Sequence, residues 1–367
     1  MLRTFNPKLQ NKLFKKNIIK KLKKVIESEQ YILGQEVTKF EKKFSKIHDM
    51  KFSISTKNGT DSLILALRAL EIKKDDEVIT TAHTALATIA SIVSLGAKPV
   101  IADIEKDFYT ICPNSILKLI SKKTKAIIPV HIYGQICDMN KIISISKKFK
   151  IPIIEDCAQA QGTKFNNKYA GSFGEISCFS FYPTKNLSAV GDGGMILTNS
   201  KKIYKKIKMQ RQYGWNDKRV ANINGINSRL DEVQAAILNV KINYLDSFNK
   251  KKNSIAKIYN SKIKNKHVIL PKVRNYCFHS FHIYSILIEN RRKFLKYLAK
   301  NKIYLSSHYE HLTFLNKGYK KKCIYNLSNL KNATSLSKKT VSLPIYPELK
   351  KNEIEHVIKV INNYGKN

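Results

Sequence analysis

Residues 52–70, FSISTKNGTDSLILALRAL, set the fold that we expect for this chain. FSIST is expected to form a short strand, Lys57 to Thr60 a turn, and residues 61–70 a helix. The same alternation continues outward along the sequence. We expect further strands at 77–80, 98–102, 125–130, 151–155 and 177–182, and further helices at 85–95 and 139–149. Strands that alternate with helices indicate an α/β fold with a mostly parallel sheet. The strands are near-continuous apolar runs, which indicates that helices cover both faces of the sheet.

The sequence on either side of this region has other patterns. Residues 15–48 carry a helical pattern of lysine and apolar positions. Near residues 246–265 the chain becomes polar and charged, with a helical pattern, and two short strands (282–288 and 302–305) and a helix (352–363) follow. A length of 367 residues also favours two domains. We therefore expect a large domain over 1–245, with the N-terminal helices, and a small C-terminal domain over 246–367.

Composition narrows the class of protein. No run of about 18 apolar residues occurs, so we expect no membrane span and no membrane partner. The basic N-terminus lacks the apolar segment and cleavage site of a signal peptide, which favours the cytoplasm. The six cysteines are scattered without a CxxC pair, which indicates buried free thiols, no disulfides and no metal site.

A formal net charge of +40 is the strongest compositional signal. One interpretation is binding to nucleic acid or to an anionic membrane. The other is an AT-rich coding bias, because lysine, asparagine and isoleucine are abundant together and the basic residues are spread along the whole chain. No zinc-finger, helix-turn-helix or RNP motif occurs, so we expect no nucleic-acid partner. A basic surface still favours anionic ligands such as nucleotide sugars.

Ligands of open α/β sheets bind beyond the carboxyl ends of the strands, so polar residues that follow predicted strands are candidates for a site. Gly59 and Thr60 begin a helix, where backbone amides favour a phosphate. The alternative is a plain turn with a helix cap. Asp156 directly follows an apolar strand, where a carboxylate needs a partner. A pyridinium nitrogen is a suitable partner, and Gln159 is placed to reach the same ring. The alternative for Asp156 is a structural cap.

Two further segments have the same placement. Ser180 and Lys185 lie in CFSFYPTKN, after another apolar strand. A lysine there can form a Schiff base if its pKa is lowered, and Ser180 can donate to a phosphate. The alternative for Lys185 is a solvated surface lysine. Asn227 and Arg229 precede a predicted helix, LDEVQAAILNVKI, and the alternative there is a capped helix start with Arg229 paired to a carboxylate.

Taken together, these segments resemble the DegT/DnrJ/EryC1/StrS sugar aminotransferases, which depend on pyridoxal phosphate (PLP) and have the type I aminotransferase fold. The resemblance runs nearly end to end. It rests on NGTDSLILAL, GAKPVIADI, IPVHIYGQICDM, IIEDCAQAQG, FSFYPTKNLSAVGDGGMI, RQYG and NSRLDEVQAAIL. It implies a large domain with a mostly parallel central sheet flanked by helices, followed by a smaller α+β domain.

The resemblance also implies roles for individual residues. Lys185 is similar to the family's catalytic lysine, which holds the cofactor and moves the proton. Asp156 corresponds to the partner of the pyridinium nitrogen, and Gln159 to a contact of the ring hydroxyl. The phosphate-binding positions correspond to Gly59, Thr60, Ser180 and, from the neighbouring subunit, Asn227, which implies a homodimer with a shared active site. The residues assigned to substrate binding are His83, Tyr213, Arg229, His308 and Tyr309.

One departure from the family pattern concerns the cofactor ring. Ala85 stands where family members place an aromatic side chain, so stacking on the ring has to come from elsewhere or be absent, and His83 is one candidate.

The implied reaction moves an amino group from L-glutamate to C3 of a dTDP-3-keto-6-deoxyhexose, for surface polysaccharide or glycan biosynthesis. Amination at C4 of a UDP- or GDP-4-keto-6-deoxy sugar is the alternative within the family. A non-catalytic PLP-binding regulator and a basic nucleic-acid-binding protein are the alternatives of other classes.

Overall fold

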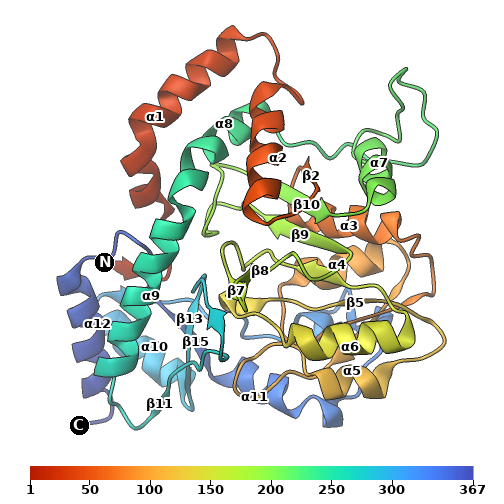
Figure 1. Ribbon diagram of the computed structural model, residues 1–367. Coiled ribbons are helices and arrows are strands. Elements are labelled where there is room, and N and C mark those ends of the chain that lie inside the picture. The colour runs from red at the N-terminus through yellow and green to blue at the C-terminus, as the bar shows by residue number, and fades with distance from the viewer. Residues whose placement is uncertain (367) are drawn as a thin grey trace.

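The computed structural model describes residues 1–366, and a central sheet with helices on both faces forms most of it (Figure 1). The strand order is β4-β3-β5-β6-β9-β10-β2, in which parallel bridges from Ile127 to Ile153 and from Val130 to Asp156 join β5 to β6. Only β10 runs antiparallel to its neighbours, so the predicted α/β class with a mostly parallel sheet is confirmed. These strands are β2 (Phe52–Thr56), β3 (Glu77–Thr81), β4 (Lys98–Ala102), β5 (Thr124–Ile128), β6 (Ile154–Asp156), β9 (Ile176–Ser180) and β10 (Gly194–Thr198).

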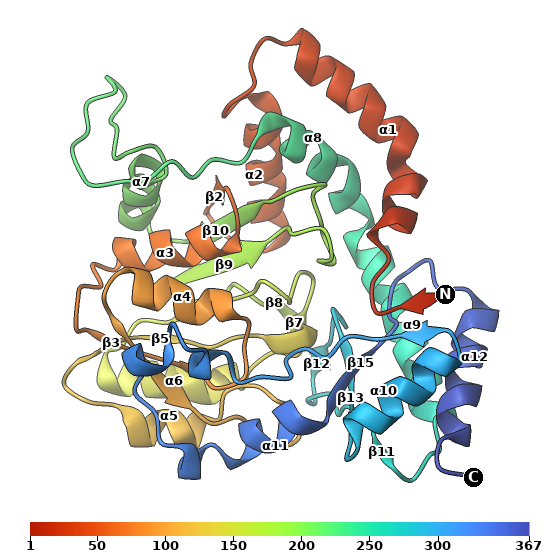
Figure 2. The same ribbon diagram turned by 180° about the vertical axis from the view of Figure 1, so that it is seen from behind.

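Two hydrophobic cores lie on the two faces of this sheet. One contains side chains from α3 (Gly59–Ala69), α4 (Leu86–Ser94) and α7 (Lys201–Gln210). The other contains side chains from α2 (Gln35–Ile47), α5 (Pro113–Leu119), α6 (Met139–Phe149) and α8 (Glu232–Lys241). Figure 1 shows α2, α5 and α6 in front, and Figure 2 shows α3 and α4 on the opposite side. Burial on both faces explains why the strands consist mostly of apolar and small polar residues and do not alternate between buried and exposed positions.

Most predicted elements agree with the structure to within one or two residues at each end, and two differ for a clear physical reason. The helical pattern over 15–48 forms two helices, α1 (Pro7–Glu27) and α2, separated by a segment in which Glu29 and Leu33 have positive φ angles of 55° and 52°. A helix cannot continue through such residues. The strand expected at 151–155 begins only at Ile154, because Pro152 has no backbone N–H to donate to a neighbouring strand.

The C-terminal part is built around a second, antiparallel sheet with the order β11-β13-β15. Its core also includes Leu2 from the other end of the chain, because β1 (Leu2–Arg3) pairs in parallel with β14 (Ile303–Tyr304). The proposed domain boundary at 245/246 falls within the first turn of α9 and stays a prediction. The elements of this part are α9 (Leu245–Lys262), β11 (Val268–Ile269), β12 (Cys277–Phe278), β13 (Tyr284–Ile288), α10 (Arg291–Lys300), α11 (Lys331–Lys339), β15 (Thr340–Leu343) and α12 (Lys351–Asn363).

A small antiparallel sheet connects the two parts. It has the order β12-β7-β8, with β7 (Lys164–Phe165) and β8 (Lys168–Tyr169) forming a hairpin beside the main sheet.

Across residues 1–366, no helix is both long and apolar enough to cross a bilayer. The six cysteines are all free, three of them buried and three half-buried, so the prediction of free thiols is confirmed and that of burial only in part.

Candidate active site

Asp156 ends β6 and is almost completely buried. Its Oδ2 accepts a hydrogen bond from Thr88 Oγ1 at 2.8 Å, and its Oδ1 accepts one from the Ala158 backbone N–H at 3.1 Å. Burial raises the pKa of Asp156, while the Ala158 amide, Thr88 and the Lys185 amine act in the opposite direction. Thr88 was not anticipated from the sequence. The sequence signal that could have indicated Thr88, on the first turn of α4, is its spacing of four residues from Thr84. Their two hydroxyls lie 2.8 Å apart.

Lys185 lies in the loop that follows β9, with its side chain only partly exposed. Burial of the amine lowers the pKa of Lys185 to about 8, and the Asp156 carboxylate partly offsets this effect. Each of the two groups therefore shifts the pKa of the other, which indicates that they lie near each other. Within the described chain, no ion pair within 4.0 Å joins the Lys185 amine to the Asp156 carboxylate. Both groups can therefore contact a bound molecule.

Gly59 brings the start of α3 against the end of β9. A Cβ atom added at Gly59 would lie 2.8 Å from Ser180 Cβ, so a larger residue does not fit there. Asn58 caps α3 by accepting a hydrogen bond from the Asp61 amide at 2.8 Å. The first amides of a helix have no partner within the helix and favour an anion. Gly59, Thr60 and the Ser180 hydroxyl thus form one cradle with the chemistry that a phosphate requires.

These features fit PLP. The cradle offers amides and a hydroxyl to the phosphate, Asp156 offers a carboxylate to a protonated ring nitrogen, and Lys185 offers an amine whose pKa is already lowered. The three groups come from the carboxyl ends of β2, β6 and β9, which lie in one sheet. Ligands of α/β sheets bind at this edge.

Gln159 belongs to a polar network above this edge. Its Oε1 accepts from the Tyr133 backbone N–H at 2.7 Å, and its Nε2 donates to Tyr309 Oη at 2.9 Å. The Tyr133 hydroxyl donates to the His308 carbonyl, and it lies 2.6 Å from His83 Nε2. The structure therefore brings Gln159, His83, His308 and Tyr309 together, and Tyr133 joins them as a residue that sequence reasoning missed.

Three histidines near Lys185 are neutral at ordinary pH. Burial lowers the pKa of His83 to about 3 and that of His308 to about 4, and burial together with the Lys185 and Lys252 amines holds the pKa of His282 well below its usual value. The Nδ1 atoms of His83 and His282 are buried without a hydrogen-bond partner. Buried polar atoms are normally paired, so these two atoms are available to a bound molecule.

The N-terminal segment also contributes to this region. The Phe5 ring stacks on the His282 ring at a centroid distance of 5.5 Å and meets the His308 ring edge-on at 5.5 Å. Phe5 was not anticipated, because nothing in the local sequence shows which distant residues a terminal segment will contact. Ala85 begins α4 as its N-cap, close in sequence to Thr88.

The remaining predicted residues lie in the loop between α7 and α8, which projects from the body (Figure 1). Tyr213 and Asn227 are exposed, and Arg229 is half-buried. Within the described chain, neither Asn227 nor Tyr213 forms a hydrogen bond with Lys185, Asp156 or Gln159. A single chain therefore leaves these two residues outside the group at the sheet edge.

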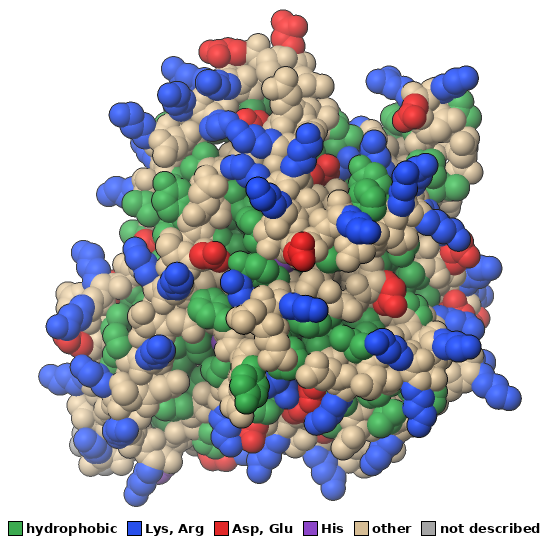
Figure 3. All heavy atoms as spheres, in the orientation of Figure 1, with side chains coloured by type: hydrophobic (Ala, Val, Ile, Leu, Met, Phe, Trp, Pro, Cys, Tyr) green, Lys and Arg blue, Asp and Glu red, His purple; other side chains and the backbone are tan. Residues whose placement is uncertain are grey.

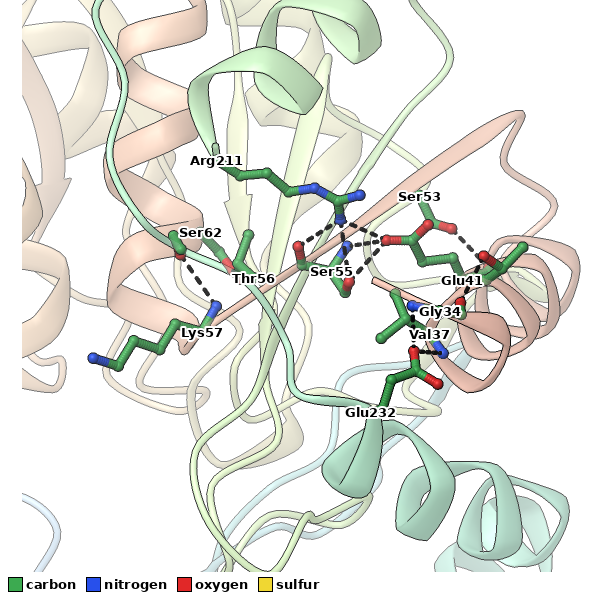
Figure 4. Close-up of polar contacts among 12 residues, drawn as sticks. Gly34, Val37, Glu41, Ser53, Ser55, Thr56, Lys57, Ser62, Arg211 and Glu232 are labelled. Atoms are coloured by element: carbon green, nitrogen blue, oxygen red, sulfur yellow. Dashed lines mark hydrogen bonds and ion pairs between the residues drawn. The ribbon is translucent and has the colours of Figure 1, made fainter. Parts of the chain in front are cut away.

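The ends of this loop are anchored by polar contacts to α2, to β2 and to Lys57, which follows β2 (Figure 4). Arg211 Nη1 donates to Glu41 Oε1 at 2.7 Å and to the Ser55 carbonyl at 2.9 Å. The Lys57 backbone N–H donates to Ser228 Oγ at 3.1 Å. Lys57, two residues before the cradle, and Ser228, the residue after Asn227, thus contact each other directly.

A second buried cluster, around Glu155 and His131, lies next to Asp156 and connects neighbouring loops by hydrogen bonds. The Glu155 carboxylate accepts from His131 Nε2 at 2.9 Å and from the backbone amides of Gly171, Phe173 and Gly174 at 2.7–2.9 Å. The Cys137 amide donates to His131 Nδ1 at 3.2 Å, and burial raises the pKa of the nearby Cys157 thiol to about 12. With its acceptors occupied and the thiol protonated, this cluster lacks the free ligands that a metal ion needs.

Comparison with known proteins gives consistent matches over almost the whole chain. The model of the DegT/DnrJ/EryC1/StrS aminotransferase family matches residues 12–362. A dTDP-3-amino-3,6-dideoxy-alpha-D-galactopyranose transaminase of Aneurinibacillus thermoaerophilus is 40% identical over 97% of each chain. A protein of Geobacillus stearothermophilus named as a pleiotropic regulatory protein is 38% identical over 97% of this chain and 96% of its own. The solved structure of S. venezuelae DesV superimposes with a TM-score of 0.96 at 30% identity, over 99% of this chain and 98% of that one.

Proposed function

The chain belongs to the DegT/DnrJ/EryC1/StrS aminotransferase family and is a PLP-dependent sugar aminotransferase, and from this premise we propose that it aminates C3 of a dTDP-3-keto-6-deoxyhexose with L-glutamate as the donor. The choice of C3 and of dTDP is supported by the name of the Aneurinibacillus relative, which is similar over 97% of its length. The observation that carries the chemistry is the mutual effect of Lys185 and Asp156 on their pKa values at one sheet edge.

The proposed roles follow from the geometry. PLP, when bound, supplies an electron sink for the carbon that gains or loses the amino group. Lys185 holds the cofactor and carries the proton to and from that carbon, which requires a neutral amine, and its pKa of about 8 makes this form accessible. Asp156 keeps the ring nitrogen protonated. Gly59, Thr60 and Ser180 hold the phosphate, and Gln159 contacts the ring hydroxyl.

Substrate recognition is assigned to the histidine and tyrosine side chains around Lys185. The unpartnered Nδ1 of His83 lies beside the network of Tyr133, His308 and Tyr309, where a sugar hydroxyl or a carboxylate can use it. We assign Tyr213 and Arg229 to the nucleotide or the donor carboxylate. His83, which lies close to the ring of Tyr309, is our candidate for the side chain next to the cofactor ring in place of an aromatic residue at position 85.

The proposed protein is a cytoplasmic homodimer in which Asn227 reaches the phosphate of the neighbouring subunit. Support comes from the exposure of Asn227 in a projecting loop, one end of which contacts Lys57, two residues before the phosphate cradle. A shared site of this kind makes assembly a condition for activity. The amino sugar product is proposed to serve surface polysaccharide or glycan synthesis.

The test is a spectrum followed by a substrate panel. Purified protein with PLP is expected to absorb in the visible range, to change on addition of L-glutamate, and to lose both properties in Lys185→Ala. A panel of 3-keto and 4-keto sugar nucleotides carrying dTDP, UDP or GDP then identifies the acceptor by mass and by the position of the new amine. Amination at C4 alone would replace the C3 proposal with the alternative within the family.

A regulatory role is the second candidate, because the Geobacillus relative is named as a pleiotropic regulatory protein. A regulator without catalysis would bind PLP and fail to convert it with glutamate, while the spectrum of Lys185→Ala would still differ from that of the wild type.

Binding to nucleic acid has less support. Figure 3 shows lysine and arginine side chains spread over the whole visible face, and a nucleic-acid complex would weaken steeply with salt.

A further inference from the structure

Two buried lysines of α8 and α9 lie behind the loop that carries Lys185. Lys252 of α9 is 5% exposed, and its Nζ donates to Asn186 Oδ1 at 2.8 Å. Lys241, the last residue of α8, is 3% exposed, and its Nζ donates to the Ser188 carbonyl at 2.9 Å and to Asn11 Oδ1 at 2.7 Å. Buried lysines are rare because the charged amine loses its hydration. Both contacts fall within three residues of Lys185.

The Lys252 contact extends into a continuous chain of hydrogen bonds. Asn186 Nδ2 donates to Asn249 Oδ1 and to the Ser280 carbonyl, both at 2.8 Å. Asn249 Nδ2 donates in turn to the Gln161 carbonyl at 2.9 Å, and Gln161 Nε2 donates to the Ser180 carbonyl. The chain therefore runs from α9 past the residue next to Lys185 and ends at the serine of the phosphate cradle.

The cost of burying these amines is not offset by a strong ion pair. Burial lowers the pKa of Lys252 to about 7 and that of Lys241 to about 8, with only a partial opposite effect from Glu348 in each case. Glu348 has a raised pKa because it is itself largely buried, and its Oε1 has no hydrogen-bond partner. An apolar side chain of similar length would avoid this cost, so packing alone does not account for lysine at these positions.

We propose that Lys252 and Lys241 are positioning residues for Lys185, which fix the loop 185–188 at two points so that the Lys185 amine faces the cofactor. Lys252 acts through the Asn186 side chain, and Lys241 acts through the Ser188 carbonyl. The proposal rests on the proposed role of Lys185 as the residue that holds PLP. Neither lysine touches the reacting atoms, so both act only through the loop.

The experiment compares Lys252→Met with Lys252→Arg, which keeps a donor, and with Lys251→Met, an exposed neighbour on the same helix. The first readout is the rate at which PLP is trapped on Lys185 of the apo-protein by cyanoborohydride, followed by the mass of the Lys185 peptide. The second is the pH midpoint of the visible absorbance of the bound cofactor. We expect trapping to slow roughly ten- to a hundredfold in Lys252→Met, since a displaced reacting group costs rate on this scale. Lys252→Arg is expected to restore most of the rate, and Lys251→Met to match the wild type.

A double-mutant cycle separates positioning from general destabilisation. Because Lys252 acts through Asn186, Lys252→Met combined with Asn186→Ala is expected to trap no more slowly than the slower single variant. Additive effects would overturn the proposal, as would a folded Lys252→Met variant with wild-type trapping and an unchanged absorbance midpoint. If Lys252→Met does not fold, Asn186→Ala alone has to slow trapping, and wild-type trapping in that variant would overturn the proposal. Failure of the wild type to trap PLP at Lys185 would instead contradict the proposed function.

Discussion

At the scale of single residues, the site depends on two ionisable groups whose pKa values the fold shifts in opposite directions. Burial disfavours the charged form of each, so it raises the pKa of Asp156 and lowers that of Lys185. Their mutual attraction works against both shifts. A cationic ring between them would take over the role of counter-charge for Asp156 and would leave Lys185 free to lose its proton. The arrangement of Asp156 and Lys185 therefore favours a bound cationic group over a direct ion pair between the two side chains.

This arrangement predicts the pH dependence of Lys185 in the apo-protein. Its pKa of about 8 lies below the ordinary lysine value of 10.5, so the neutral, reactive fraction is expected to rise as the pH passes from 7 to 9. Labelling by an amine-reactive reagent, measured on the Lys185 peptide by mass, should give a midpoint near pH 8. Because the Asp156 carboxylate raises the pKa of Lys185, Asp156→Asn is expected to move the midpoint to lower pH. A midpoint near that of the exposed Lys251 would contradict the prediction.

At the scale of elements, the phosphate cradle depends on how closely α3 approaches β9. Gly59→Ala places a Cβ atom 2.8 Å from Ser180 Cβ, so the helix start has to move away from the strand end. We expect at least a tenfold weaker affinity for PLP, and a loss of about 1–3 kcal/mol in the free energy of unfolding, which is typical of overpacking. Absorbance titration with PLP and urea unfolding measure the two effects. Gly318→Ala is the matched control, because a Cβ atom there has no neighbour within 4 Å.

The ion pair between Arg211 and Glu41 joins α2, β2 and the end of α7 behind this cradle (Figure 4). Glu41→Gln leaves the buried guanidinium without its carboxylate, and loss of one partner of such a pair costs about 3 kcal/mol. Chemical unfolding of the apo-protein measures this loss. Glu71→Gln removes the partner of Lys206 from an exposed pair and is expected to leave the unfolding midpoint unchanged. Equal effects of the two substitutions would contradict the assignment of a structural role to Arg211.

Elements with a strong local pattern could be predicted from the sequence, and contacts between distant elements could not. The bounds of α6 and the strand FSIST agree with the structure because apolar period and turn residues define them locally. Strand β10 and helix α7 were not predicted, since the glycine turn before them gives no sign that the chain returns antiparallel between β9 and β2. Asp156 and Lys185 were found because each follows an apolar strand. Tyr133, Lys252 and Asn186 were missed because their partners are remote in sequence.

At the scale of the whole molecule, the N-terminal segment packs against the C-terminal part of the chain beside the active site. β1 pairs with β14, Thr4 Oγ1 donates to the Ser342 carbonyl, and Phe5 stacks on His282. The first five residues therefore pack on the C-terminal part, next to His282 and His308. No sequence pattern indicated this, because a terminal strand of two residues has too few positions to show a period.

The proposed shared active site leads to a prediction that only the assembled protein can test. If Asn227 serves the site of the neighbouring subunit, Lys185→Ala and Asn227→Asp variants damage different members of one composite site. A mixed dimer then contains one site with both residues intact, although each parent dimer is impaired. Random reassociation of equal amounts is expected to restore about one quarter of the wild-type sites, because half of the dimers are mixed and each has one intact site.

The control for this experiment is a mixture of Lys185→Ala with Asp156→Asn. Both residues come from the same chain in each site, so no mixed dimer contains an intact site and no activity should return. The fraction of mixed dimers is measured by native mass spectrometry with one isotopically labelled parent. Mixed dimers without recovered activity in the Asn227→Asp mixture would contradict a contribution of Asn227 across the interface. The exposure of Asn227 in a projecting loop, apart from the Lys185 group of its own chain, is the structural reason to expect recovery.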